Sequence, residues 1–112
     1  MRISAFKRTA PAARLGEHVP FHASDVAQAP ETPGVYVLYR GHRLIYIGLA
    51  AAGTTIRQCL RRHLRGEGGP CTHGATEFDY ESADDPVALY RHYLGVYVEA
   101  TGGLLPDCNE AH

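Results

Sequence analysis

A cysteine and a histidine four residues apart are the side chains of this sequence best suited to covalent chemistry. Cys59 and His63 occupy positions i and i+4 of a segment with helical periodicity, so their side chains can meet on one face. A thiol beside an imidazole, in a segment that also carries several arginines, can become an activated nucleophile. The alternative is that Cys59 is a small apolar side chain that fills space in the core. Both interpretations stay open at this point.

The remaining cysteines and histidines form no recognisable metal site. Cys71, His73, Cys108 and His112 are of the right types for zinc, but their spacing matches no closed zinc pattern, and we expect no metal ligands among them. Three cysteines cannot all pair, and their spacing resembles no disulfide framework, which is typical of a reducing compartment. The sequence also shows no signal peptide and no apolar run long enough to span a membrane. We therefore expect a cytoplasmic protein with no membrane partner.

Hydrophobic patterning predicts the elements that must position these side chains. Residues 35–39 and 44–48 are β-branched, aromatic or aliphatic and flank a short turn, so we expect a β-hairpin. A helix should follow, capped by Thr54 or Thr55 and running to about Arg65. Its buried stripe recurs every fourth residue and consists of Ile56, Leu60 and Leu64.

The rest of the chain completes a small α+β domain. Residues 76–82 alternate as a third strand, and a last helix begins at Pro86 and ends before Gly102. We expect a three-stranded antiparallel sheet flanked by helices in the order β-β-α-β-α. Residues 34–112 should form this domain, and residues 1–33, punctuated by prolines, an arm that packs on it.

Two tripeptides give the hairpin a specific resemblance. Gly34-Val35-Tyr36 precedes the turn, and Tyr46-Ile47-Gly48 follows it at the distance of one hairpin. An arginine-rich helix, a third strand, a second helix and a terminal Leu105-Pro106-Asp107-Cys108-Asn109 come next. From about residue 30 to residue 110 the chain resembles the GIY-YIG nuclease family. Some members of that family also carry a loop similar to Gly69-Pro70-Cys71-Thr72 and a Pro-x-Cys-Asn end.

The resemblance implies the fold of a metal-dependent endonuclease. In that family two tyrosines line a cleft and help to activate the attacking water, and a helix arginine steadies the phosphate. A glutamate on the second helix holds a divalent metal, and an asparagine lies nearby. Phosphodiester hydrolysis needs a deprotonated nucleophile and charge relief on the phosphoryl oxygens, which these groups supply. The residues of this chain that match are Tyr36, Tyr46, His63 and Asn109.

The two charged groups of the family site are replaced. Just before the buried Leu60, the position of the family's arginine holds Cys59, and Arg62 is the nearby arginine that can swing in. The glutamate should fall near Tyr90, or at His92 if the register slips, and neither is a carboxylate. Losing one preorganised charge-stabilising donor costs roughly a hundredfold or more in rate, so we expect ordinary metal-dependent cleavage to be lost. The residues expected to bind substrate instead are Arg62, Tyr90, His92 and Asn109.

Three functions from different classes follow. We favour an enzyme whose site is rebuilt around Cys59, His63, Tyr36 and Tyr46, which works without a cofactor and acts on a small molecule. The second is a residual endonuclease that uses Arg62 and Mg²⁺, and the third is a non-catalytic nucleic-acid or protein binder. The 11 basic and 12 acidic residues give a formal net charge of −1, whereas nucleic-acid binders usually carry a basic excess. The sequence predicts neither a named substrate nor an oligomeric state.

Overall fold

The strand-forming segments build one antiparallel sheet that lies between two helical layers. The computed structural model describes residues 18–109, so residues 1–17 of the predicted arm (residues 1–33) lie outside the described residues. Along the chain the elements are β1 (Val19–Pro20), α1 (Ala23–Val26), β2 (Gly34–Arg40), β3 (Arg43–Ala50), α2 (Ile56–Leu64), α3 (Pro70–His73), β4 (Glu77–Ser82) and α4 (Pro86–Ala100). The predicted α+β class is confirmed.

The sheet has four strands rather than the predicted three, in the order β1-β4-β2-β3. The additional strand, β1, is two residues long and pairs Val19 with Phe78 at the edge of β4. A pair of residues that includes a proline carries no strand periodicity, and proline is tolerated only because β1 is an edge strand. The short helix α3 was also missed, because four residues give no helical period to detect.

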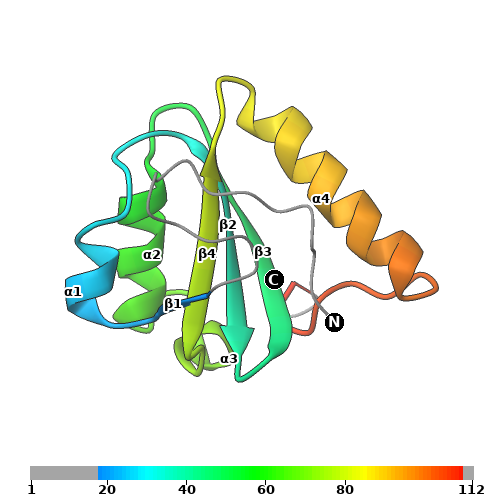
Figure 1. Cartoon of the computed structure of the whole chain (residues 1–112), viewed down its shortest axis with the longest axis horizontal. Coiled ribbons are helices and arrows are strands. Elements are labelled where there is room, and N and C mark those ends of the chain that lie inside the picture. The colour runs from blue at the N-terminus through cyan, green and yellow to red at the C-terminus, as the bar shows by residue number, and fades with distance from the viewer. Residues whose placement is uncertain (1–17, 110–112) are drawn as a thin grey trace.

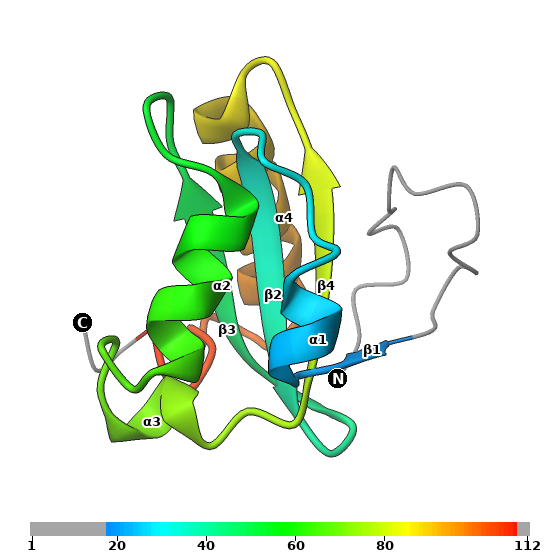
Figure 2. The same ribbon diagram turned by 90° about the vertical axis from the view of Figure 1, so that its left-hand side faces the viewer.

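The two faces of the sheet are covered by different helices, as Figures 1 and 2 show: α1 and α2 lie on one face and α4 on the other. Alternate residues of β2 therefore enter two separate cores. Tyr36 and Leu38 join the cluster beneath α1 and α2, whereas Val35, Val37 and Tyr39 pack against α4. Burial on both faces explains why this strand is apolar without alternation.

The helices begin where their capping residues predict. The Thr55 side chain accepts a hydrogen bond from the Gln58 amide at the start of α2, and the Asp85 carboxylate accepts one from Ala88 at the start of α4. In the predicted stripe of α2, Ile56 and Leu60 are fully buried and Leu64 is half-buried.

The cysteine prediction was wrong. Cys71 and Cys108 form a disulfide, with Cα atoms 5.6 Å apart and a sequence separation of 37. Only the fold brings these segments together, so their linear spacing gave no sign of the pair. The disulfide also removes an observation on which the cytoplasmic prediction depended, since disulfides persist mainly in oxidising compartments. Within residues 18–109, no helix is long and apolar enough to cross a membrane.

Candidate functional site

Helix α2 presents Cys59 and His63 toward the central strands. Cys59 directly precedes the fully buried Leu60 and His63 follows it by three positions. The two residues are 8% and 6% exposed. Together with Tyr36, they line an open pocket of about 280 Å³. The complete lining is Tyr36, Leu49, Cys59, Arg62, His63, Glu67 and Gly68. The i, i+4 spacing thus places the thiol and the imidazole on the same side of the helix, as expected.

The two signature tyrosines lie beside this histidine. The ring centroid of Tyr46 is 5.1 Å from that of His63 and 6.0 Å from that of Tyr36. The Tyr36 and His63 centroids are 5.5 Å apart. The structure therefore brings all four predicted catalytic residues together, with Cys59 on the same pocket wall.

A hydrogen-bonded chain runs through the imidazole. Tyr36 Oη lies 2.8 Å from His63 Nε2, and Thr72 Oγ1 lies 2.8 Å from His63 Nδ1. Both hydroxyl groups can donate or accept, so the chain can hold His63 in either tautomer. Thr72 is fully buried, on α3, and sequence reasoning gave it no role. Its only signal was its place in the Gly-Pro-Cys-Thr loop.

Glycines allow the close approaches that this chain needs. A Cβ on Gly68 would lie 2.6 Å from His63 Cε1 and 2.9 Å from Thr72 Oγ1, so the backbone at residue 68 covers the imidazole directly. A Cβ on Gly48 would lie 2.5 Å from Tyr36 Oη. The last residue of the second tripeptide is therefore glycine because the Tyr36 ring rests on it.

Burial keeps the two tyrosines protonated. It raises the pKa of Tyr36 well above its usual value, and the nearby Tyr46 and Cys59 raise it further, while Arg62 opposes them. Burial also raises the pKa of Tyr46, although the hydrogen bond with Tyr36 works against it. Near neutral pH, Tyr36 is therefore a phenol that can donate or relay a proton, not a standing phenolate base.

Two opposite charges stand at the pocket. Arg62 lines it and acts on Tyr36, although its side chain is exposed. Glu67 lines it too, but its carboxylate accepts a hydrogen bond of 2.6 Å from Arg65, which lowers the pKa of Glu67. Of the arginines on α2, Arg62 is the one that lines the pocket.

The other predicted binding residues lie outside the pocket lining. Tyr90 is half-buried on α4 and is close enough to Tyr46 to raise its pKa. His92 is exposed, and its ring contacts Tyr93 at a centroid distance of 5.4 Å. Asn109 uses its side-chain amide on the edge of β3, where it accepts from the Ile47 amide and donates to the Ile47 carbonyl at 2.9 and 3.0 Å.

The divalent metal that the resemblance implies does not fit these residues. The expected ligand position on α4 holds the Tyr90 phenol, and Mg²⁺ prefers carboxylate oxygens. No three His, Cys, Asp or Glu side chains converge within the described part of the chain. Two of the zinc candidates, Cys71 and Cys108, are sulfurs of the disulfide.

Comparison of the chain with models of known families, with curated proteins and with solved structures finds no match.

Proposed function

We propose that this pocket is the active site of a small-molecule enzyme on a divergent GIY-YIG-like fold, with Cys59 as its nucleophile. The observation that carries the proposal is the shared pocket: one wall holds the thiol, Tyr36 and a histidine fixed by two hydrogen bonds. A nucleophile beside an oriented base is the arrangement that covalent catalysis requires.

The proton path runs through Tyr36. His63 Nε2 is bonded to the Tyr36 hydroxyl, and both residues line the pocket together with Cys59. In attack on an activated acyl group, the Cys59 sulfur forms a bond to the carbonyl carbon. Its proton passes by way of Tyr36 to His63, and the same path returns it to the leaving group. Water then hydrolyses the thioester and restores the thiol.

The size and charge of the pocket favour a small anionic substrate. A volume of about 280 Å³ is at the lower end for ligand pockets, and it is too small for a duplex. Arg62 supplies a cation beside the tyrosines, and the net charge of −1 gives no general attraction for nucleic acid.

The test combines thiol labelling with an acyl probe. With Cys71 and Cys108 in the disulfide, Cys59 is the free thiol that iodoacetamide can label. We expect native protein to be labelled at neutral pH faster than protein unfolded in urea. Hydrolysis of p-nitrophenyl acetate should disappear in Cys59→Ala and fall by roughly 10²-fold or more in Tyr36→Phe and His63→Gln. Gln58→Ala, an exposed neighbour on α2, is the matched control. Labelling that appears only on unfolding would assign Cys59 to packing.

A residual nuclease is the second candidate, because Arg62 lines the pocket beside Tyr36. The same preparations distinguish it. We expect no nicking of supercoiled plasmid with Mg²⁺. Nicking that depends on the metal and disappears in Tyr36→Phe, with no Cys59-dependent acyl hydrolysis, would reverse the order of the two candidates.

A further inference from the structure

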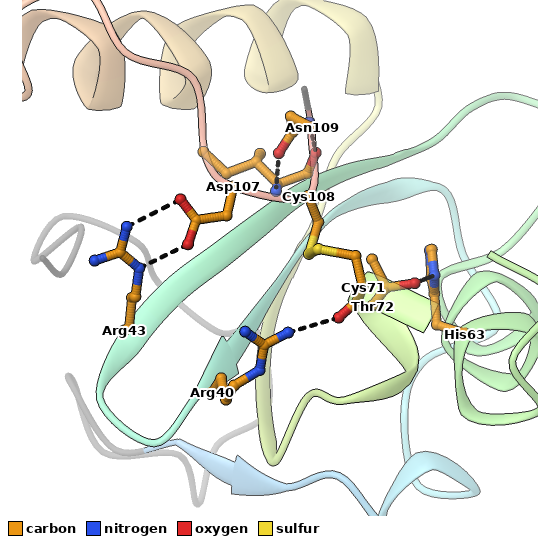
Figure 3. The surroundings of a disulfide bond; sticks show 9 residues. Arg40, Arg43, His63, Cys71, Thr72, Asp107, Cys108 and Asn109 are labelled. Carbon is orange, nitrogen blue, oxygen red and sulfur yellow. Dashed lines mark hydrogen bonds and ion pairs between the residues drawn. A yellow bond between two sulfur atoms is a disulfide. The ribbon is translucent and has the colours of Figure 1, made fainter. Parts of the chain in front are cut away.

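The disulfide joins two segments that each support the pocket. Cys71 directly precedes Thr72, which is bonded to His63. Cys108 directly precedes Asn109, whose amide pairs with both backbone groups of Ile47, next to Tyr46. We call these segments the first arm (residues 66–73) and the second arm (residues 106–109). Figure 3 shows that the two arms meet at the sulfur atoms of Cys71 and Cys108. Each half-cystine is therefore one residue from a side chain that positions a part of the candidate site.

The first arm, α3 with the loop before it, is short. Helix α3 has four residues, and the loop before it contains Gly66 and Gly69 at φ values of 83° and 97°. The Arg40 guanidinium donates to the Cys71 carbonyl at 2.9 Å, and this group is exposed. Thr72 is fully buried and bonded to His63, and the disulfide is the covalent bond that ties its segment to the C-terminal tail on β3.

The second arm covers the free edge of β3. The Cys108 amide donates to the Ile45 carbonyl at 2.7 Å, and Arg43 holds Asp107 through two hydrogen bonds of 2.7 and 2.9 Å. These contacts hold the segment against residues 43–47, so the edge strand that carries Tyr46 is not left unpaired there.

We infer that Cys71–Cys108 is a reversible redox switch that controls the Tyr36–His63 site; its consequence for catalysis rests on the proposed function. A dithiol reductant attacks Cys71, which is half-buried, whereas Cys108 is fully buried. A mixed disulfide forms at Cys71, and the Cys108 sulfur leaves and takes a proton. The second thiol of the reductant then closes its own disulfide and releases Cys71 as a thiol. Two electrons and two protons pass from the dithiol to the protein.

Reduction loosens both arms while the rest of the fold persists. The paired strands and the core between the sheet and α4 contain neither sulfur. Release of α3 weakens the bond from Thr72 to His63 Nδ1, and release of the tail exposes the edge of β3. The oxidised protein is therefore the form with the oriented imidazole.

The experiment compares the oxidised full chain with the chain reduced by dithiothreitol, without denaturant. The readouts are the ¹⁵N chemical shifts of the His63 ring and amide exchange at residues 107–109, neither of which requires catalytic activity. We expect reduction of the folded protein to change the His63 ring shifts and to speed this exchange by roughly tenfold or more. Oxidised glutathione should restore both. A failed acyl assay with these shifts intact would count against the proposed function alone.

Two variants serve as matched controls. Cys71→Ser with Cys108→Ala should reproduce the reduced state without dithiothreitol. Thr72→Val should change the His63 shifts while it leaves the disulfide and the amide exchange at residues 107–109 unchanged. Three outcomes would each show that the bond is only a structural disulfide. The disulfide could resist reduction until the protein unfolds, reduction could unfold the chain, or the His63 shifts could be unaltered by reduction.

Discussion

His63 is the central residue of the proposed mechanism. In serine hydrolases a carboxylate orients the catalytic imidazole. Here the Thr72 hydroxyl takes the orienting position at Nδ1, and the Tyr36 phenol occupies Nε2. Because burial raises the pKa of Tyr36 well above its usual value, Tyr36 stays protonated near neutral pH, and in the proposed mechanism it relays a proton to His63 and cannot replace it as a base. Substitution of Cys59, Tyr36 or His63 alone should therefore lower the rate about as much as substitution of all three together.

The raised pKa of Tyr36 predicts a loss of stability at alkaline pH. A group whose pKa is higher in the folded state contributes stability below its unfolded pKa, here near 10.0, and loses that contribution as the pH rises through the folded value. The free energy of unfolding should therefore decline above about pH 10. The decline should be smaller in Tyr36→Phe. Urea unfolding between pH 8 and pH 11 measures it, and parallel profiles for the two proteins would contradict this account.

At the level of elements, an irregularity in the β2–β3 hairpin decides which face Tyr46 occupies. Leu38 pairs with Tyr46, but Tyr39 pairs with Leu44, so Ile45 is an extra residue in β3. Leu44 consequently packs toward α4, while Tyr46 packs on the α2 side with Tyr36. A bulge redirects a side chain in this way at little cost to the sheet. Simple alternation from residue 44 would have placed Leu44 and Tyr46 on the same face.

Gly48→Ala should disturb both stability and the site. The new Cβ would fall 2.5 Å from Tyr36 Oη and closer still to the ring, so the phenol must move away from His63. We expect a loss of about 1–3 kcal/mol in the free energy of unfolding. The matched control is Gly95→Ala, in the interior of α4 with open space around it. That change should stabilise by about 0.5–1 kcal/mol. Thermal and urea unfolding measure both, and equal effects of the two substitutions would disprove the close contact.

At the scale of the whole molecule, the C-terminal segment closes a chain that would otherwise leave β3 as a free edge. The segment from Pro106 to Asn109 bonds to Ile45 and Ile47, and the disulfide links it to α3. The sheet, the tail and α3 are thus one connected unit around the tyrosines. A small domain gains more from such a link than a large one, because its core is limited.

Loss of the disulfide should lower the free energy of unfolding by about 3–4 kcal/mol, the entropy expected for a closed loop of 37 residues. Urea unfolding of Cys71→Ser, Cys108→Ala and the double variant measures it. Either single change already opens the loop, so the double variant should cost little more than the larger single effect. Strictly additive losses would show that the two sulfurs stabilise the fold through separate packing contacts.

The sequence alone determined the local structure of this protein. Apolar runs, caps and turns predicted the hairpin, α2, β4 and α4, because each of these signals depends on neighbouring residues. The i, i+4 spacing likewise placed Cys59 and His63 on one side of α2. Tyr36 and Tyr46 were assigned to a common cleft by the two tripeptides and their resemblance to a family, not by periodicity.

Only the tertiary structure determined the contacts between residues that are far apart in the sequence. Thr72 reaches His63, Cys71 reaches Cys108, and Asn109 binds the backbone of Ile47, across separations of 9, 37 and 62 residues. None of these contacts has a local pattern, because their positions are set by how the sheet and helices pack. For the same reason the sequence assigned Asn109 to the pocket, whereas packing places its amide on the edge of β3.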